Sequence, residues 1–212
     1  LIFYDIPDKV LAGNEYVKSP LNFGYTDGII IIIDPLSVVS FREKCISRGE
    51  VSRSIRYSEE GCESVIVDFI NKFSEIVGRS AGRMSDIPVA VLISKSDIKS
   101  VKGKIGLPSI RAQYRRSPES YGNDWLVARN EICRSFLCDI GLVNVVNNIE
   151  AVFTEVNYFP VSAIGHAPES GIAFEPFGVI EPVAWIARKR QSALYLCMKN
   201  VLTKLNCGSH EG

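Results

Sequence analysis

The sequence predicts an α/β protein with a doubly wound, mostly parallel sheet. Four short apolar segments of strand composition alternate along the chain with segments of helical periodicity. The clearest strand, residues 28–34 (GIIIIID), is apolar at nearly every position, which is typical of a parallel strand covered on both faces. Right-handed connections would wind this order into one layered domain over residues 1–212. The length allows a sizeable core.

The chain opens with two of these strands. Residues 1–6 (LIFYDI) are apolar and aromatic, and a Pro-Asp step follows them. Residues 8–27 contain the glycine, asparagine and proline of a loop. The strand over residues 28–34 is stopped by an Asp-Pro step. Because Leu1 lies directly in strand-like sequence, we expect the natural chain to begin upstream, with an incomplete N-terminus here.

The middle of the chain should supply one helix and one strand between two insertions. Residues 42–60 are polar and charged, and we expect a mobile loop or insertion there. Residues 60–77 place their apolar side chains on one helical face. Residues 87–94 (IPVAVLIS) form the third strand. Residues 99–124 show no sustained period and are expected to be a second insertion.

The last part of the chain should complete the domain. Asp124 is expected to cap a helix running to about residue 140, and a second helix should follow to residue 152. The fourth strand covers residues 155–162. After a loop rich in proline and glycine, residues 181–205 are expected to form a long amphipathic helix.

The composition indicates a cytoplasmic protein and supports neither a nucleic-acid nor a membrane partner. Lys plus Arg equals Asp plus Glu at 24 each, so there is no global basic field. The six cysteines include no CxxC pair, and only two histidines occur, which argues against zinc. We expect reduced thiols, partly buried in helices.

Polar motifs follow three of the four expected strands, where ligands sit in parallel sheets. Asp5 ends the first strand, and a carboxylate there can hold a magnesium ion through water. A turn-capping role for Asp5 is the alternative.

The second motif, Ser94-Lys95-Ser96-Asp97, has a specific chemistry. A carboxylate accepts two hydrogen bonds side by side, and guanine offers two donors, N1–H and the 2-amino group. Adenine offers neither, so Asp97 would discriminate between the bases. The stem of Lys95 can lie on the base while its ammonium links neighbouring loops. A solvated polar loop is the alternative.

The third motif, Ser162-Ala163-Ile164-Gly165, follows the fourth strand. The small Ala163 lets a backbone N–H approach the guanine carbonyl oxygen, and Gly165 permits a tight turn. A simple turn is the alternative.

Taken in order, the segments DIPD, SKSD and SAIG resemble the D-x-x-G, [N/T]-K-x-D and S-A-x motifs of P-loop GTPases. Residues 176–185 (PFGVIEPVAW) resemble the lead into the last helix of double-GTPase-like members of the translation-factor-related (TRAFAC) class. The resemblance implies a P-loop GTPase-like fold that binds GTP or GDP with Mg²⁺. It assigns nucleotide contacts to Ser94, Lys95, Asp97, Ser162 and Ala163, and the metal's water to Asp5.

Three departures from the family pattern limit what the resemblance implies. No G-x-x-x-x-G-K-[S/T] phosphate-binding loop occurs, so GTP and Mg²⁺ binding requires that loop to be supplied upstream. Asp8 stands where the family has a glycine beside the γ-phosphate, and a carboxylate there repels phosphate. Ser94 replaces Asn or Thr but keeps a hydroxyl.

Three hypotheses for function therefore stay open. The first is a guanine-nucleotide-binding domain that could act as a molecular switch. No catalytic residue is assigned to it, and whether it hydrolyses GTP stays open. The second is a degenerate GTPase fold that binds a protein partner through the insertions at 42–60 and 99–124. The third is an unrelated doubly wound protein in which the motifs are accidental.

Overall fold

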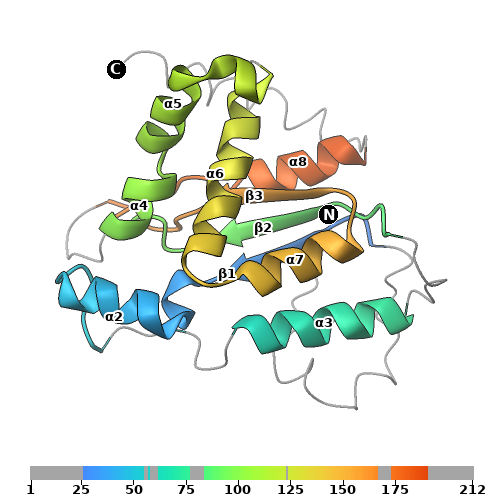
Figure 1. The fold of residues 1–212 in the computed structure, drawn as a ribbon, viewed down its shortest axis with the longest axis horizontal. Coiled ribbons are helices and arrows are strands. Elements are labelled where there is room, and N and C mark those ends of the chain that lie inside the picture. The colour runs from blue at the N-terminus through green and yellow to red at the C-terminus, as the bar shows by residue number, and fades with distance from the viewer. Residues whose placement is uncertain are drawn as a thin grey trace.

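A three-stranded, all-parallel sheet forms the centre of the molecule (Figure 1). The computed structural model describes residues 26–54, 57, 62–76, 84–122, 124–166 and 173–190. The strands are β1 (Ile29–Ile33), β2 (Val89–Ile93) and β3 (Val156–Pro160), in the order β1-β2-β3. All three were expected from the sequence, and the α/β class is confirmed. The expected strand over residues 1–6, with Asp5, lies outside the described residues.

Helices flank this sheet, and among those of the described residues α3, α6, α7 and α8 were expected. The helices of the described residues are η3 (Pro35–Ser37), α2 (Val39–Ser47), α3 (Cys62–Ile76), α4 (Lys99–Ile105), α5 (Leu107–Arg116), η4 (Pro118–Tyr121), α6 (Trp125–Asp139), α7 (Val143–Val152) and α8 (Glu181–Lys189). Asp124 caps α6 as predicted, because its Oδ1 accepts a hydrogen bond of 2.8 Å from the Leu126 amide. The helix expected over 181–205 is described as far as Lys189.

Helices occupy much of residues 99–124, where no sustained helical period was expected, and α2 extends into the start of the segment 42–60. Residues 39–47 form α2, and residues 99–116 form α4 and α5. Each of these helices is short and buries few side chains, such as Phe41 and Cys45 of α2 or Val101 and Ile105 of α4. Two buried residues four positions apart give only one repeat of the helical period, which is too little to recognise in a polar sequence.

The two faces of the sheet are covered by different helices. On one face, β-strand side chains join the main hydrophobic core with α3, α6 and α7, including the fully buried Phe73, Ile93 and Leu137. On the other face, α8 packs Trp185 and Ile186 against a smaller cluster around Ala90 and Phe159. β2 is buried almost throughout, as its continuous apolar sequence predicted.

β1 is only partly covered, which corrects the expectation of burial on both faces. Ile29, Ile31 and Ile33 face the main core and are buried. Ile32, on the α8 side, is 66% exposed. The strand order winds in one direction only. The reversal that defines a doubly wound sheet would involve the segment 1–6, outside the described residues.

Two outward-facing positions of β3, Tyr158 and Pro160, offer no free N–H group at the outer edge of the sheet. Residues of a parallel strand point their backbone groups alternately to either side, and the Val161 amide donates to Ile93 of β2 at 2.9 Å. Tyr158, of the opposite parity, therefore points its N–H outward, where the Asn130 Oδ1 of α6 accepts it at 2.8 Å. Pro160, next on the same side, has no N–H. No free amide remains at these two positions.

An ion pair between α6 and α7, together with a hydrogen bond from β3, links these three elements. Arg134 donates to both carboxylate oxygens of Glu150, at 2.7 and 2.8 Å, and the Tyr158 hydroxyl donates to Oε1 at 2.9 Å. Burial alone would raise the pKa of Glu150, but the hydrogen bonds from Arg134 and Tyr158 lower it below its ordinary value. The pKa of Tyr158 is raised, chiefly by burial and by the Glu150 charge. The carboxylate is thus held ionised between two donors.

Candidate functional site

The polar motifs of the sequence converge at one edge of the sheet. Because the strands are parallel and adjacent, their carboxyl ends meet there. Asp34 follows β1, Ser94 to Asp97 follow β2, and Ser162 follows β3 after one residue. Two short hydrogen-bonded groups connect these ends.

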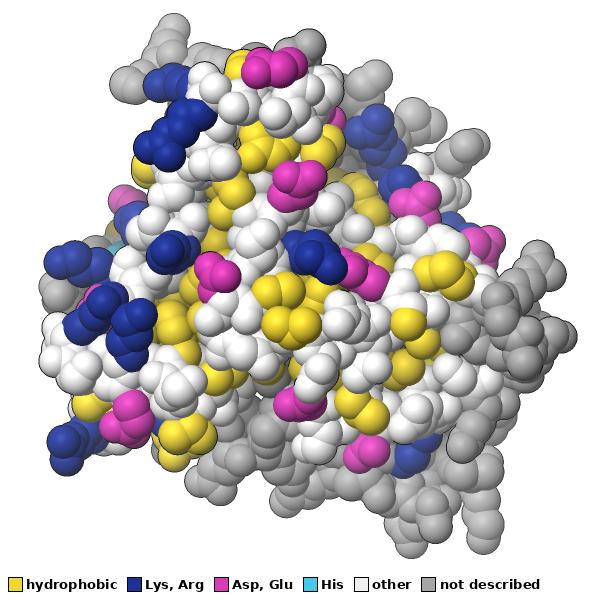
Figure 2. All heavy atoms as spheres, viewed as in Figure 1, with side chains coloured by type: hydrophobic (Ala, Val, Ile, Leu, Met, Phe, Trp, Pro, Cys, Tyr) yellow, Lys and Arg dark blue, Asp and Glu magenta, His cyan; other side chains and the backbone are white. Residues whose placement is uncertain are grey.

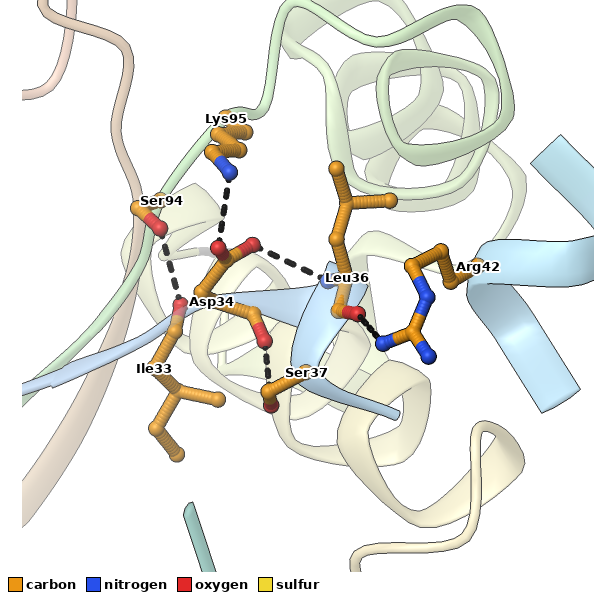
Figure 3. Close-up of polar contacts among 7 residues, drawn as sticks. All are labelled: Ile33, Asp34, Leu36, Ser37, Arg42, Ser94 and Lys95. Carbon is orange, nitrogen blue, oxygen red and sulfur yellow. Dashed lines mark hydrogen bonds and ion pairs between the residues drawn. The ribbon is translucent and has the colours of Figure 1, made fainter. Parts of the chain in front are cut away.

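The first group joins β1 to β2 (Figure 3). The Ser94 hydroxyl donates to the Ile33 carbonyl at 3.1 Å. The Lys95 ammonium pairs with Asp34 Oδ2 at 2.7 Å, while Oδ1 of the same carboxylate accepts the Leu36 amide at 2.9 Å and caps η3. Lys95 thus fastens the loop after β2 to the end of β1.

Lys95 also has a left-handed backbone, with φ of 54°. Among the described residues other than glycine, it alone has a positive φ. For a residue with a side chain, such a conformation costs about 1–2 kcal/mol, so surrounding contacts must hold it. The ion pair to Asp34 and the neighbouring amide of Ile98, which donates to the Lys95 carbonyl at 3.1 Å, supply such contacts.

The second group joins β2 to β3. The Ser162 hydroxyl donates to Asp97 Oδ1 at 2.6 Å and accepts the Gly165 amide at 2.8 Å. The Ser96 amide donates to the Val161 carbonyl at 3.1 Å, and the buried Ser96 hydroxyl donates to the Ile93 carbonyl at 2.7 Å. Asp97 is half-buried and lies against the tip of β3.

The loop after β3 needs glycine where the sequence has it. Gly165 has φ of +87°, and a Cβ there would lie 2.0 Å from the Glu175 carbonyl oxygen. Gly178 has φ of +70°, and a Cβ there would lie 2.1 Å from the Pro160 carbonyl oxygen. Ser162, three residues before Gly165, and Phe177, directly before Gly178, form an antiparallel bridge. The predicted tight turn at Gly165 is therefore present, and the loop folds back over the end of β3.

The predicted site residues that the structure describes lie in two groups at the strand ends. Ser94 and Lys95 bond to the β1 side, Asp97 and Ser162 bond to each other, and Ala163 lies exposed in the next position. Asp5 lies outside the described residues. From the sequence, Asp34 was expected only to end a strand. The Asp-Pro step was the available signal, since it also suits the cap of a short helix.

Two clefts of the described part of the chain lie away from these strand ends. One, of about 230 Å³, lies among α4, α5, η4 and α6, with Tyr121 and Phe136 in its wall. The other, of about 450 Å³, lies between α6, β3 and α8. Within the described ranges, no group of three or more His, Cys, Asp or Glu side chains is placed to hold a metal ion.

Three cysteines, Cys45, Cys133 and Cys138, are free thiols. Cys45 and Cys133 are buried, and Cys138 is partly buried. Burial raises the pKa of Cys133 to about 12 and also raises that of Cys45. Both thiols are therefore protonated at neutral pH and unsuited to nucleophilic attack. In the part of the chain that the structure covers, no helix has the length and apolarity needed to cross a membrane.

A basic surface covers α4 and α5. Between Asp97 and Glu119 there is no acidic residue, and six exposed cations occur: Lys99, Lys102, Lys104, Arg111, Arg115 and Arg116. Figure 2 shows Lys and Arg side chains gathered along the left of the view, over α5, α4 and α2. The overall charge balance thus conceals a local excess of positive charge.

Comparison of the chain with protein-family models, with curated proteins and with solved structures finds no match.

Proposed function

We propose that the chain is a guanine-nucleotide-binding domain of the P-loop GTPase type, with the base held at the carboxyl ends of β2 and β3. The position of Asp97 is the observation on which the proposal depends. Its carboxylate lies just beyond the central strand and is oriented by the 2.6 Å hydrogen bond from Ser162. An oriented carboxylate at this edge is the group needed to accept two donors of guanine.

The remaining contacts support that role. Asp97 Oδ1 has a second lone pair, and Oδ2 has no hydrogen-bond partner among the residues that the structure describes. Lys95 lies two residues before Asp97, with its ammonium fixed by Asp34, so its stem is available to lie on a base. Ala163 follows Ser162 directly and would offer its backbone N–H to the base carbonyl oxygen.

The phosphates and the metal ion require residues beyond those described. In the proposed complex Asp5 would hold a water of Mg²⁺, and a phosphate-binding loop upstream would hold the phosphates. Mg²⁺ would supply charge neutralisation at the phosphates. The proposal therefore assigns base recognition to this chain and leaves hydrolysis to a chain that includes the loop.

The test is calorimetry of the chain extended upstream to include the phosphate-binding loop, with GDP, GTP and ATP, repeated with Asp97→Asn. We expect heat with the guanine nucleotides and none with ATP. Because an amide can donate where the carboxylate accepts, Asp97→Asn should lose GDP and gain xanthosine diphosphate. Asp86→Asn, an exposed carboxylate before β2, is the matched control and should leave base preference unchanged. Equal binding of GDP and ATP, or an unchanged preference in Asp97→Asn, contradicts the proposal.

The basic surface over α4 and α5 favours a second candidate, a non-catalytic module that binds an acidic protein partner. Its six exposed cations span residues 99–116, part of the segment expected to contact a partner. The same calorimetry separates the candidates. If no nucleotide gives heat, while an acidic peptide binds and loses affinity on Arg115→Glu and Arg116→Glu, the second candidate is supported.

A further inference from the structure

We propose that the cleft between α6, β3 and α8 is a binding site for a small organic oxyanion that also carries a hydrogen-bond donor. The cleft measures about 450 Å³, within the usual range for small-molecule sites. Its wall includes Arg129, Asn130, Asn157, Trp185, Arg188 and Lys189.

This cleft is separate from the strand-end site. Asn157 lies five residues before Ser162 along the chain, a span of about 16 Å in an extended strand. The last turn of α8 lies at the amino-terminal end of the sheet, because the Arg190 Nε donates at 2.9 Å to the carbonyl of Asp27, just before β1. The proposal is therefore independent of nucleotide binding at Asp97.

Arg129 provides the first argument. It is 6% exposed, and no described residue forms an ion pair or hydrogen bond with its guanidinium; its Nε is fully shielded and without an acceptor. The guanidinium carbon lies 4.3 Å from the Phe159 ring centroid and 5.9 Å from that of Trp125, so aromatic rings face it. What these contacts leave unsatisfied is its Nε–H group, one of the donors with which arginine binds carboxylate or phosphate.

Asn157 provides the second argument. Its Oδ1 is buried and has no donor among the residues that the structure describes, and Asn157 lines the same cleft as Arg129. Each unmade hydrogen bond of a buried polar atom costs about 1–3 kcal/mol, so both atoms favour a bound partner. An anion alone would satisfy Arg129 and be repelled by Oδ1. A ligand with a hydroxyl or amino group beside its oxyanion would satisfy both.

The surrounding charges and the aromatic wall agree with a small anion. Lys189 is neutralised by Glu155 at 2.6 Å, which leaves Arg129 and the exposed Arg188 against Asp124. The residues that line the cleft thus carry an excess of one positive charge, although the carboxylate of Glu181, outside the lining, also interacts with Arg129. Trp185 offers a flat apolar surface for the carbon skeleton. Hydroxy acids and sugar phosphates have this combination of groups.

The experiment titrates the full chain with two matched pairs of probes. Glycerate is compared with propionate, and glycerol 3-phosphate with propyl phosphate, because the members of each pair differ only in their hydroxyl groups. Binding is followed by calorimetry and by the NMR signal of the arginine Nε–H groups. We expect one hydroxylated probe to bind about tenfold more tightly than its partner and to shift the Arg129 signal. The better-binding pair identifies the oxyanion as carboxylate or phosphate.

Variants then test the assignment without disturbing buried Arg129. Arg188→Ala should weaken binding of the preferred probe by about threefold to tenfold, as expected for loss of one charge-assisted contact. Asn157→Leu should abolish the preference for the hydroxylated member of the pair. Arg115→Ala, an exposed arginine of α5 outside the cleft, is the control and should bind as the unaltered chain does.

Three outcomes would overturn the proposal. One is the absence of binding and of any shift at Arg129 with all four probes at tens of millimolar. Another is binding that Arg188→Ala and Asn157→Leu leave unchanged. The third is a crystal structure soaked with the probes in which an ordered water alone bridges Arg129 and Asn157.

Discussion

At the scale of single residues, Lys95 combines a left-handed backbone with an ion pair to the neighbouring strand end. The pair joins residues 61 positions apart, and the side chains of Lys95 and Asp34 are 31% and 17% exposed. No local pattern in the sequence pairs two residues so far apart, which is why Asp34 was not predicted as part of the site. Asp97 and Ser162 could be proposed because the parallel-sheet prediction already brought their strand ends together.

Lys95→Met is expected to lower the free energy of unfolding by about 1 kcal/mol, since it leaves a half-buried carboxylate without its cation. Methionine keeps a similar length and the same need for a left-handed backbone. The loss should diminish in 1 M salt, because salt already screens the pair in the unaltered chain. Urea unfolding measures both values.

Lys99→Met in α4 removes an exposed lysine and serves as the control. An effect of Lys95→Met no larger than that of the control, in low salt, would show that the ion pair contributes nothing to stability.

At the scale of elements, length decided which helices could be predicted. α3 and α6 each span 15 residues and have clear boundaries, such as the Asp124 cap. α4 spans seven residues without a side-chain cap, and α5 is mostly polar with Ile110 as its buried residue. These short helices are stabilised by packing against neighbours rather than by intrinsic propensity, so their sequences alone resemble loops.

The ion pair between Arg134 of α6 and Glu150 of α7 should contribute to the free energy of unfolding. Glu150→Gln should reduce the free energy of unfolding at pH 7 by about 1.5–3 kcal/mol, because it removes two charge-assisted hydrogen bonds between α6 and α7. The pKa of Glu150 is lowered in the folded chain, so the carboxylate stabilises the fold fully above its ordinary value of 4.5. That contribution is lost as the pH falls through the lowered folded-state pKa.

The difference between the unaltered chain and Glu150→Gln should therefore be constant from pH 7 to pH 5 and shrink at lower pH. Denaturant unfolding across this range measures it. A difference that grows with acidification would contradict the sign of the shift.

At the scale of the whole molecule, the α/β class and the parallel sheet follow from the alternation of apolar runs and amphipathic helices. The partial cover of β1 does not follow from them. Five consecutive isoleucines predict burial on both sides, yet Ile33 is fully buried and Ile32 is 66% exposed. The pattern of apolar residues predicts that a segment is a strand, whereas the burial of each strand face depends on which elements pack against it.

Alanine substitutions should distinguish Ile93, which is buried in the main core, from Ile32, which is exposed on the other face of the sheet. Ile93→Ala, fully buried in the central strand, should cost about 2–5 kcal/mol, because it leaves a cavity in the main core. Ile32→Ala should change the free energy of unfolding by less than about 1 kcal/mol, since the side chain already contacts water. Urea unfolding provides both values, and equal losses at the two sites would show that Ile32 is covered in solution.

The lack of a free N–H group at Tyr158 and Pro160, on the outer edge of β3, has a consequence for self-association. A sheet recruits a foreign strand by offering unpaired amides, and amyloid-like growth proceeds along such a template. At Tyr158 the amide is already occupied by Asn130, and at Pro160 there is none. Removing the Asn130 side chain would leave the Tyr158 N–H unpaired in the middle of a β-branched and aromatic segment. We therefore expect Asn130 to disfavour the addition of a foreign strand beside β3.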